Sequence, residues 1–161
     1  MRLFSRYPAT NRLLMMKIYL DMCCFNRPYD IQTAARIKLE TEAKLFIQNA
    51  VLDSKLILVW SFILDYENSA NPYPDHREAI VEWKTLSKHY ISALDSIREL
   101  GATIAIKTGI KSKDALHLAC AVEAKCDYFI TTDRVFLKKA QSLQEIKTLN
   151  PIDFAILMEN S

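Results

Sequence analysis

The chain contains very little glycine: only Gly101 and Gly109 occur among its 161 residues. Walker-type phosphate loops, G-x-G-x-x-G dinucleotide turns and G-x-S-x-G nucleophile elbows each need several closely spaced glycines, where the backbone turns tightly or approaches a ligand. The sequence therefore excludes these three classes of site.

Cysteine pairs with metal-binding spacing are also missing. Cys23 and Cys24 are adjacent, Cys120 and Cys126 lie far downstream, and neither C-x-x-C spacing nor a paired histidine motif accompanies them. We therefore expect four reduced thiols without a disulfide or a structural zinc, as is usual in a cytoplasmic protein. No apolar run reaches the ~18 residues of a membrane span, so we expect no membrane partner.

Length and charge give only broad limits. The chain is close to the length of one domain, and its net charge of +2 is too small to indicate nucleic-acid binding by charge alone. Patterned sequence begins at Met16, so we expect residues 1–15 to be a leader or extension outside the fold and residues 16–161 to form one domain. The apolar stretches of 1–15 are too short for a secretory signal.

Strand-like and helix-like patterns alternate over the rest of the chain. Short apolar runs, typical of strands covered on both faces, occur at 17–20, 56–60, 103–106, 128–131 and 146–149. Helical spacing or caps occur at 31–50, 61–69, 75–100, 112–123, 135–140 and 151–158, with a loop expected at 23–30 and Gly101 ending the longest helix. This alternation predicts an α/β sandwich around a mostly parallel sheet of roughly five strands.

Four acidic residues fall near the expected carboxyl ends of these strands. Asp21 closes the first strand and Asp133 follows the fourth, while Asp114 opens a helix after the third and Glu67 lies on the helix after the second. Ligands of parallel sheets bind beyond the carboxyl ends of strands, and Mg²⁺ or Mn²⁺ favours oxygen ligands. Without a cation, converging carboxylates would repel one another. Taken singly each acid has a structural explanation, but together they predict a metal site.

Four segments in this order resemble a PIN domain, and the similarity extends to P-I-D-F at 151–154. The segments are Y-L-D-M-C-C-F-N-R at 19–27, S-F-I-L-D-Y-E-N at 61–68, K-S-K-D-A-L-H-L-A-C-A at 111–121 and D-Y-F-I-T-T-D-R-V-F at 127–136. The resemblance implies a three-layer α/β/α sandwich and metal-dependent endoribonuclease activity, as in VapC-type toxins of toxin–antitoxin pairs. The partners that it implies are an RNA substrate, a cognate antitoxin and a second copy of the chain in a homodimer.

The resemblance also assigns the site. It implies catalytic and metal-binding roles for Asp21, Glu67, Asp114 and Asp133, with Mg²⁺ or Mn²⁺ activating a water for in-line attack on phosphorus. Residues two apart on a helix face different sides, so only one of Asp65 and Glu67 can face the metal, and the family spacing favours Glu67. Basic residues near the acids are candidate RNA contacts, namely Arg27, Lys111, Lys113 and Arg134.

Other functions remain to be weighed against this one. A PIN-like module that binds RNA or protein without cleaving it is the alternative, and activity on RNA would discriminate between the two. Signalling receivers and haloacid-dehalogenase-type phosphatases need a second acid where Met22 or Cys23 stands. His76, His89 and His117 share no metal or triad spacing, so we interpret them as structural or surface residues, although His117 follows Asp114 by three positions.

Overall fold

A five-stranded parallel sheet forms the centre of the computed structural model, which describes residues 15–160. Its strands are β1 (Met16–Leu20), β2 (Leu56–Ser61), β3 (His89–Ile91), β4 (Tyr128–Ile130) and β5 (Lys147–Leu149), in the order β3-β2-β1-β4-β5. β1 pairs with both β2 and β4, so the chain crosses from one half of the sheet to the other at this central strand. The leader expected at residues 1–15 lies outside the described residues, except for Met15.

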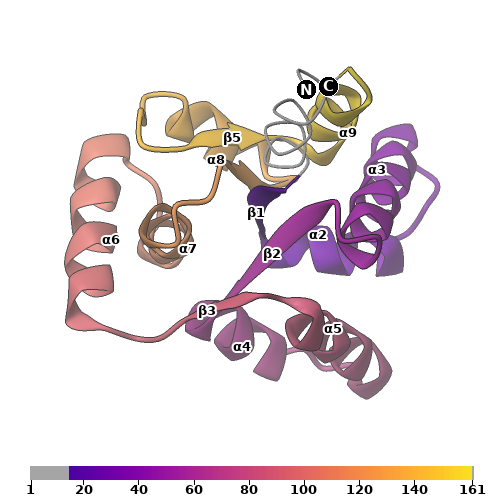
Figure 1. Ribbon diagram of the computed structural model, residues 1–161, viewed down its shortest axis with the longest axis horizontal. Coiled ribbons are helices and arrows are strands. Elements are labelled where there is room, and N and C mark those ends of the chain that lie inside the picture. Colours follow the sequence, from indigo (N-terminus) through magenta and orange to yellow (C-terminus); the bar gives the residue numbers. More distant parts are fainter. Residues whose placement is uncertain (1–14, 161) are drawn as a thin grey trace, which may run out of the picture.

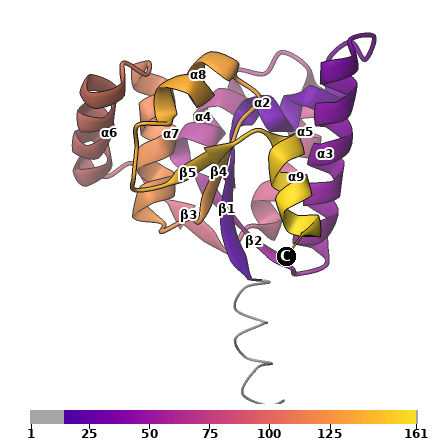
Figure 2. The same cartoon turned by 90° about the horizontal axis from the view of Figure 1, so that it is seen from above.

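Helices cover both faces of the sheet (Figures 1 and 2). They are α2 (Met22–Asn26), α3 (Ala35–Leu52), α4 (Phe62–Ser69), α5 (Pro74–Leu86), α6 (Asp95–Thr108), α7 (Ser112–Glu123), α8 (Arg134–Ala140) and α9 (Pro151–Glu159), with a 3₁₀ turn η1 (Arg27–Tyr29). α3 and α9 pack together on one side, and α7 lies on the other with α6 outside it. The three-layer α/β/α sandwich is thus confirmed.

Aromatic side chains fill the core between these layers. Tyr19 of β1 stacks on Phe129 of β4, whose ring stacks in turn on Phe136 of α8, with 5.1 Å between centroids in each pair. Trp60 of β2 meets Phe25 of α2 edge to face at 5.2 Å. All of these rings are buried, as expected for parallel strands that are covered on both faces.

The segment between residues 75 and 106 differs from the sequence prediction. The expected helix at 75–100 is two helices, α5 and α6, separated by the edge strand β3, and the expected strand at 103–106 is the end of α6. Ile97, Gly101 and Ile104 recur at helical spacing on the buried side of α6, and this period overrides the local β-propensity of 103–106. Gly101 does not end a helix; Gly109, at φ 75°, ends α6.

The expected loop at 23–30 was also wrong, because α2 and η1 occupy it. The Asp21 carboxylate accepts a hydrogen bond from the backbone N–H of Met22 at 2.8 Å and so caps α2. The helices expected at 61–69, 112–123 and 151–158 are present as α4, α7 and α9. The Ser61 hydroxyl caps α4 by accepting from the N–H of Leu64 at 3.3 Å, and Pro151 lies in the first turn of α9.

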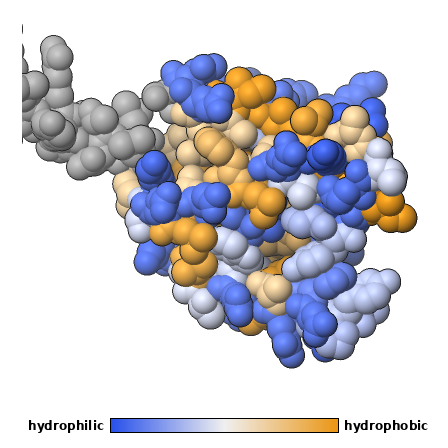
Figure 3. Space-filling model, turned by 90° about the vertical axis from the view of Figure 1, so that its right-hand side faces the viewer, coloured by the Kyte–Doolittle hydropathy of each residue, from blue (hydrophilic) through white to orange (hydrophobic). Residues whose placement is uncertain are grey.

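Exposed large apolar side chains come from several elements, among them α3, α5 and α6. On the side that carries α3, hydrophobic residues lie between hydrophilic ones (Figure 3); those of α3 itself are Leu39, Leu45, Phe46 and Leu52. All four cysteines, Cys23, Cys24, Cys120 and Cys126, are free. Within residues 15–160, no helix is long and apolar enough to cross a bilayer.

Candidate functional site

The candidate site lies at the carboxyl edge of the sheet, where the chain order reverses at β1. Asp21 directly follows β1, Thr131 and Asp133 follow β4, and α4 and α7 bring further side chains to the same edge. In open parallel sheets, the divergence of the connections at such a point leaves a crevice for ligands.

Asp21 is buried and firmly held, with only 7% of the residue exposed. Besides capping α2, its carboxylate accepts a hydrogen bond from the Thr131 hydroxyl at 2.8 Å, and its backbone N–H donates to the carbonyl of Ile130 at 2.9 Å. The Cys23 thiol approaches the same carboxylate oxygen at 3.4 Å. These contacts join the ends of β1 and β4 and fix where the carboxylate points.

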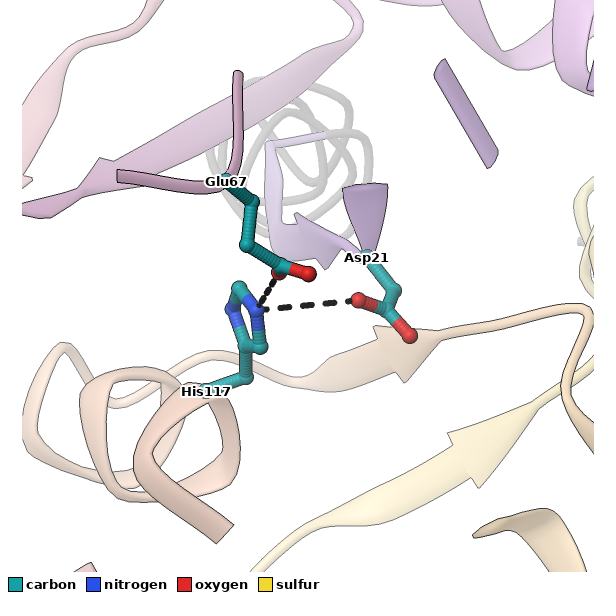
Figure 4. Close-up of side chains that lie close together, drawn as sticks. All are labelled: Asp21, Glu67 and His117. Carbon is teal, nitrogen blue, oxygen red and sulfur yellow. Dashed lines mark hydrogen bonds and ion pairs between the residues drawn. The ribbon is translucent and has the colours of Figure 1, made fainter. Parts of the chain in front are cut away.

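Glu67 and His117 complete a compact group with Asp21 (Figure 4). His117 Nε2 is hydrogen-bonded to the Glu67 carboxylate and lies 3.9 Å from Asp21 Oδ1. Potential ligand atoms of all three residues lie within 4.8 Å of one another. Segments that are far apart in the sequence, the end of β1, α4 and α7, therefore place two carboxylates and an imidazole around one point.

Buried hydroxyls orient the imidazole from its other side. The Tyr19 hydroxyl lies 2.6 Å from His117 Nδ1 and 2.6 Å from the Ser61 hydroxyl. Burial raises the pKa of Tyr19 well above its ordinary value, so the phenol keeps its proton and can donate it to Nδ1. In that tautomer Nε2 carries a proton and donates to Glu67, so His117 holds Glu67 in place while the carboxylate oxygens remain ligands.

The charges of this group act on one another. Burial works against ionisation of Glu67, but the hydrogen bond from His117 and the Lys113 ammonium, 3.4 Å away, together lower its pKa below the ordinary value. The pKa of Asp114 is raised, first by burial and then by the negative charge of Asp21, with smaller contributions from Asp133 and Glu67. The four acids thus share one electrostatic environment.

Asp114 and Asp133 lie beside this group rather than inside it. Both line a pocket of about 170 Å³, together with Lys111. Asp133 is exposed, and its carboxylate accepts a hydrogen bond from the N–H of Phe136 at 3.1 Å as the N-cap of α8. The backbone N–H of Asp133 donates to the Thr131 hydroxyl at 3.2 Å. One hydroxyl, that of Thr131, therefore connects Asp21 to Asp133.

The basic candidates divide into two kinds. Lys111, Lys113 and Arg134 are exposed beside the acids. Arg27 instead binds the carboxylate of Glu40, at 2.8 Å, and that of Asp30, at 2.9 Å. Because two carboxylates already hold its guanidinium, Arg27 has a structural role in fastening η1 to α3.

Asp65 is directed away from the group. Its carboxylate accepts from the Trp60 indole at 2.8 Å, the Tyr90 hydroxyl at 2.6 Å and the Lys84 ammonium at 3.0 Å. Burial opposes its ionisation, but these hydrogen bonds lower the pKa of Asp65 overall. Of the two acids on α4, Glu67 is the one that meets Asp21.

Sequence reasoning did not assign His117 and Thr131 to this site. The spacing of His117 from Asp114 was the available signal, since residues three apart share a helix face. Thr131 gave no comparable signal, because a hydroxyl that follows an apolar strand is common. Only the pairing of β1 with β4 brings it onto Asp21.

Comparisons with known proteins identify the family of this chain. The sequence model of the PIN domain matches residues 18–142. This chain belongs to the PIN domain family. The matched residues include Asp21, Glu67, Asp114 and Asp133, although the match alone gives them no role. A search of curated proteins finds no match.

Solved structures share the PIN fold at low sequence identity. VapBC2 from Rickettsia felis, bound to a promoter DNA fragment, is 12% identical, with a TM-score of 0.50 over 84% of this chain and 98% of that one. FitAB bound to the IR36 DNA fragment is 15% identical, with a TM-score of 0.51 over 84% and 95%. PAE2754 from Pyrobaculum aerophilum is 15% identical, with a TM-score of 0.53 over 91% and 97%. At these identities the likeness concerns the fold.

Proposed function

We propose that this PIN domain is a metal-dependent endoribonuclease that hydrolyses phosphodiester bonds of RNA. The observation that carries the proposal is the meeting of Asp21, Glu67 and His117 at the carboxyl edge of the sheet, with Asp114 and Asp133 beside them. Structural ion pairs balance acids with bases, whereas among the described residues the only lysine or arginine that is ion-paired with any of these four acids is Lys113, which contacts Glu67.

The donor set fits a hard divalent cation. It offers carboxylate oxygens, which Mg²⁺ and Mn²⁺ prefer, and Asp21 is fixed before any ion arrives. The raised pKa of Asp114 reflects burial and repulsion by its acidic neighbours, and a cation would relieve that repulsion. In this proposal Asp21, Glu67, Asp114 and Asp133 hold Mg²⁺ or Mn²⁺, directly or through water.

Each residue then has a part in hydrolysis. A bound divalent cation lowers the pKa of water and neutralises charge on phosphate oxygens. His117 keeps Glu67 oriented, and Thr131 does the same for Asp21. Lys111, Lys113 and Arg134 are exposed beside the acids and are positioned to attract the RNA phosphates.

The proposal extends to partners and location. VapBC2 and FitAB, which share the fold, were each solved with DNA, and the resemblance to VapC-type toxins adds a cognate antitoxin and a homodimer to the proposal for this chain. Four free thiols, three of them buried, suit a reducing cytoplasm, where RNA substrates are also found.

Replacing Asp21 by asparagine tests the proposal. Asp21→Asn keeps the shape of the side chain but removes the charge, so we expect cleavage of a mixed set of structured and single-stranded RNAs to fall by roughly 10²-fold or more. Thermal melting should be unchanged or slightly higher, because repulsion among the acids decreases. EDTA should abolish wild-type cleavage, and Mg²⁺ or Mn²⁺ should restore it.

Two outcomes would contradict the proposal. Cleavage by Asp21→Asn at the wild-type rate would remove this carboxylate from the chemistry. Cleavage that persists in EDTA would exclude a dissociable metal. RNA binding by a wild type that leaves every RNA intact in either metal would favour the non-cleaving module.

A further inference from the structure

We infer that a second pocket, adjoining the acidic group, binds an unpaired nucleobase of the RNA. It has a volume of about 370 Å³, and its lining includes Met22, Asn26, Tyr29, Asn71, Tyr73 and His76. This volume lies within the range of small-molecule sites. The inference rests on the proposed function, because it places the base of a nucleotide whose phosphate lies at the acids.

The pocket and the acidic group share a wall. Glu67 belongs to both, and Met22, which also lines the pocket, is the residue whose N–H binds Asp21. A phosphate at the acidic group would therefore lie beside the pocket. The base of an adjoining nucleotide can then enter the pocket while the phosphate of the same RNA strand stays at the acidic group.

Three aromatic rings give the pocket a surface for stacking. The His76 ring is stacked on Tyr29, with centroids 3.8 Å apart and planes at 10°, and Tyr73 lies 4.8 Å from His76 on a tilt. Tyr29 is 44% exposed and Tyr73 61% exposed, far more than core aromatics. Every nucleobase has a π-face, so exposed rings beside a phosphate site suit stacking with a base.

The polar groups suit a base better than a phosphate. Of the described residues that line the pocket, Asp30 and Glu67 are acidic and none is a lysine or arginine. The Asn71 side-chain amide donates to Asn26 Oδ1 at 3.5 Å, which leaves the Asn26 amide N–H groups and the second Asn71 N–H as donors toward the edge of a base. Phosphates are attracted instead to Lys113, which lies 3.4 Å from Glu67, and to Lys111, which lines the smaller pocket of Asp114 and Asp133.

Hydrogen bonds hold the rim of the pocket in shape. The Asn71 side chain accepts from the N–H of Tyr73 at 3.1 Å, and Arg77 donates to the Asn71 carbonyl at 2.8 Å. Asn68, which is buried, donates to the carbonyl of Arg77 at 3.0 Å. A preformed rim lowers the ordering cost of binding. Since only an unpaired base can stack there, the pocket selects single-stranded RNA.

Fluorescence of 2-aminopurine tests the pocket without requiring cleavage. The probes are four single-stranded RNA 12-mers, each with a central 2-aminopurine flanked by one of the four nucleotides, titrated with full-length protein in EDTA and in Mg²⁺. Tyr29→Ala and Tyr73→Ala remove the rings, and Tyr66→Ala is the control, because Tyr66 is 65% exposed on α4 but does not line the pocket. Circular dichroism melts confirm that each variant folds.

We expect wild type and Tyr66→Ala to quench at least one probe, and Tyr29→Ala and Tyr73→Ala to raise its Kd about 10-fold. Where wild type also cleaves the probe, KM should rise in the two pocket variants with a smaller change in kcat. Equal Kd values in folded pocket variants and wild type, or no quenching by wild type, would overturn the inference. Quenching without cleavage in Mg²⁺ or Mn²⁺ would support the pocket while rejecting the nuclease.

Discussion

The two acids of α4 show how a helix separates residues by function. Asp65 serves the fold, because Trp60, Tyr90 and Lys84 all donate to it. Glu67, two positions later, reaches His117 on α7. Because residues two apart on a helix diverge, one acid supports the packing of α4 against α5 and β3 while the other faces the candidate site.

Conservative replacement of each acid should separate these roles. Glu67→Gln removes a proposed metal ligand, so we expect cleavage to fall by roughly 10²-fold with little change in stability. Asp65→Asn weakens hydrogen bonds from Lys84 and Tyr90, so it should cost about 1 kcal/mol of unfolding free energy and leave cleavage unchanged. RNA cleavage assays and urea titrations of both variants measure this. Loss of cleavage in Asp65→Asn alone would mean that the two acids have been assigned the wrong way round.

At the scale of elements, the close approach of α6 to α7 depends on a small residue. A Cβ added to Gly101 would lie 3.0 Å from Leu116 Cδ2 and 3.5 Å from its Cγ. The end of a leucine side chain can move, so one methyl group can be accommodated, whereas a branched side chain cannot without separating the helices.

Replacing Gly101 by alanine and by valine should therefore change the free energy of unfolding by different amounts. For Gly101→Ala, the gain in helix propensity, about 1 kcal/mol, opposes the tighter contact, and we expect a net change below 1 kcal/mol. Gly101→Val should destabilise by about 2 kcal/mol through overpacking. Ala102→Val, at the exposed neighbouring position, is the control for a β-branched residue in α6. Equal urea midpoints for Gly101→Val and Ala102→Val would show that α6 and α7 have room to spare.

A buried lysine ammonium, that of Lys44, makes the stability of the whole protein depend on pH. Lys44 of α3 is only 5% exposed, and its ammonium lies 5.6 Å from the Phe25 ring centroid and 5.8 Å from that of Trp83. Among the residues that the structure describes, no carboxylate pairs with it. Burial lowers its pKa from 10.5 to about 8.

This shift sets the sign of a pH effect. Between pH 8 and 10.5 the unfolded chain binds more protons at Lys44 than the folded chain does, so the cost of burying the charge is full below pH 8 and is relieved as pH rises. Lys44→Met should therefore be more stable than wild type by up to about 3 kcal/mol at pH 7, with the difference shrinking to about 1 kcal/mol at pH 10.

Denaturant unfolding of both proteins at several pH values measures this difference. Comparing each variant with wild type at the same pH cancels the titration of the tyrosines that both share. A Cys24→Ala background removes the one cysteine whose charge acts on Lys44. Lys38→Met, at an exposed position of the same helix, controls for replacing a lysine by methionine. A stability difference for Lys44→Met that stays constant from pH 7 to 10 would show that the buried ammonium is not destabilising.

The sequence by itself determined the layered α/β class and the order of most elements. Apolar runs such as 56–60 predict covered strands wherever they lie, because both faces of a parallel sheet must be buried. Asp21 and Asp133 were found as acids near strand ends, since the direction of a parallel sheet fixes which edge receives them. These inferences need only local pattern and chain direction. Asp114 was reached through an expected strand at 103–106 that is part of helix α6, so its place beside the other acids was not correctly derived from the sequence.

Only the tertiary structure decided the rest. Thr103–Ile106 has a strand-like composition, yet contacts between α6 and α7 make it helical, and local propensity cannot reveal such contacts. The same holds for the site: His117 meets Glu67, and Thr131 meets Asp21, across 50 and 110 positions of chain. Packing of the helices on the sheet brings these partners together. The number of residues between two partners in the sequence does not predict that they will meet.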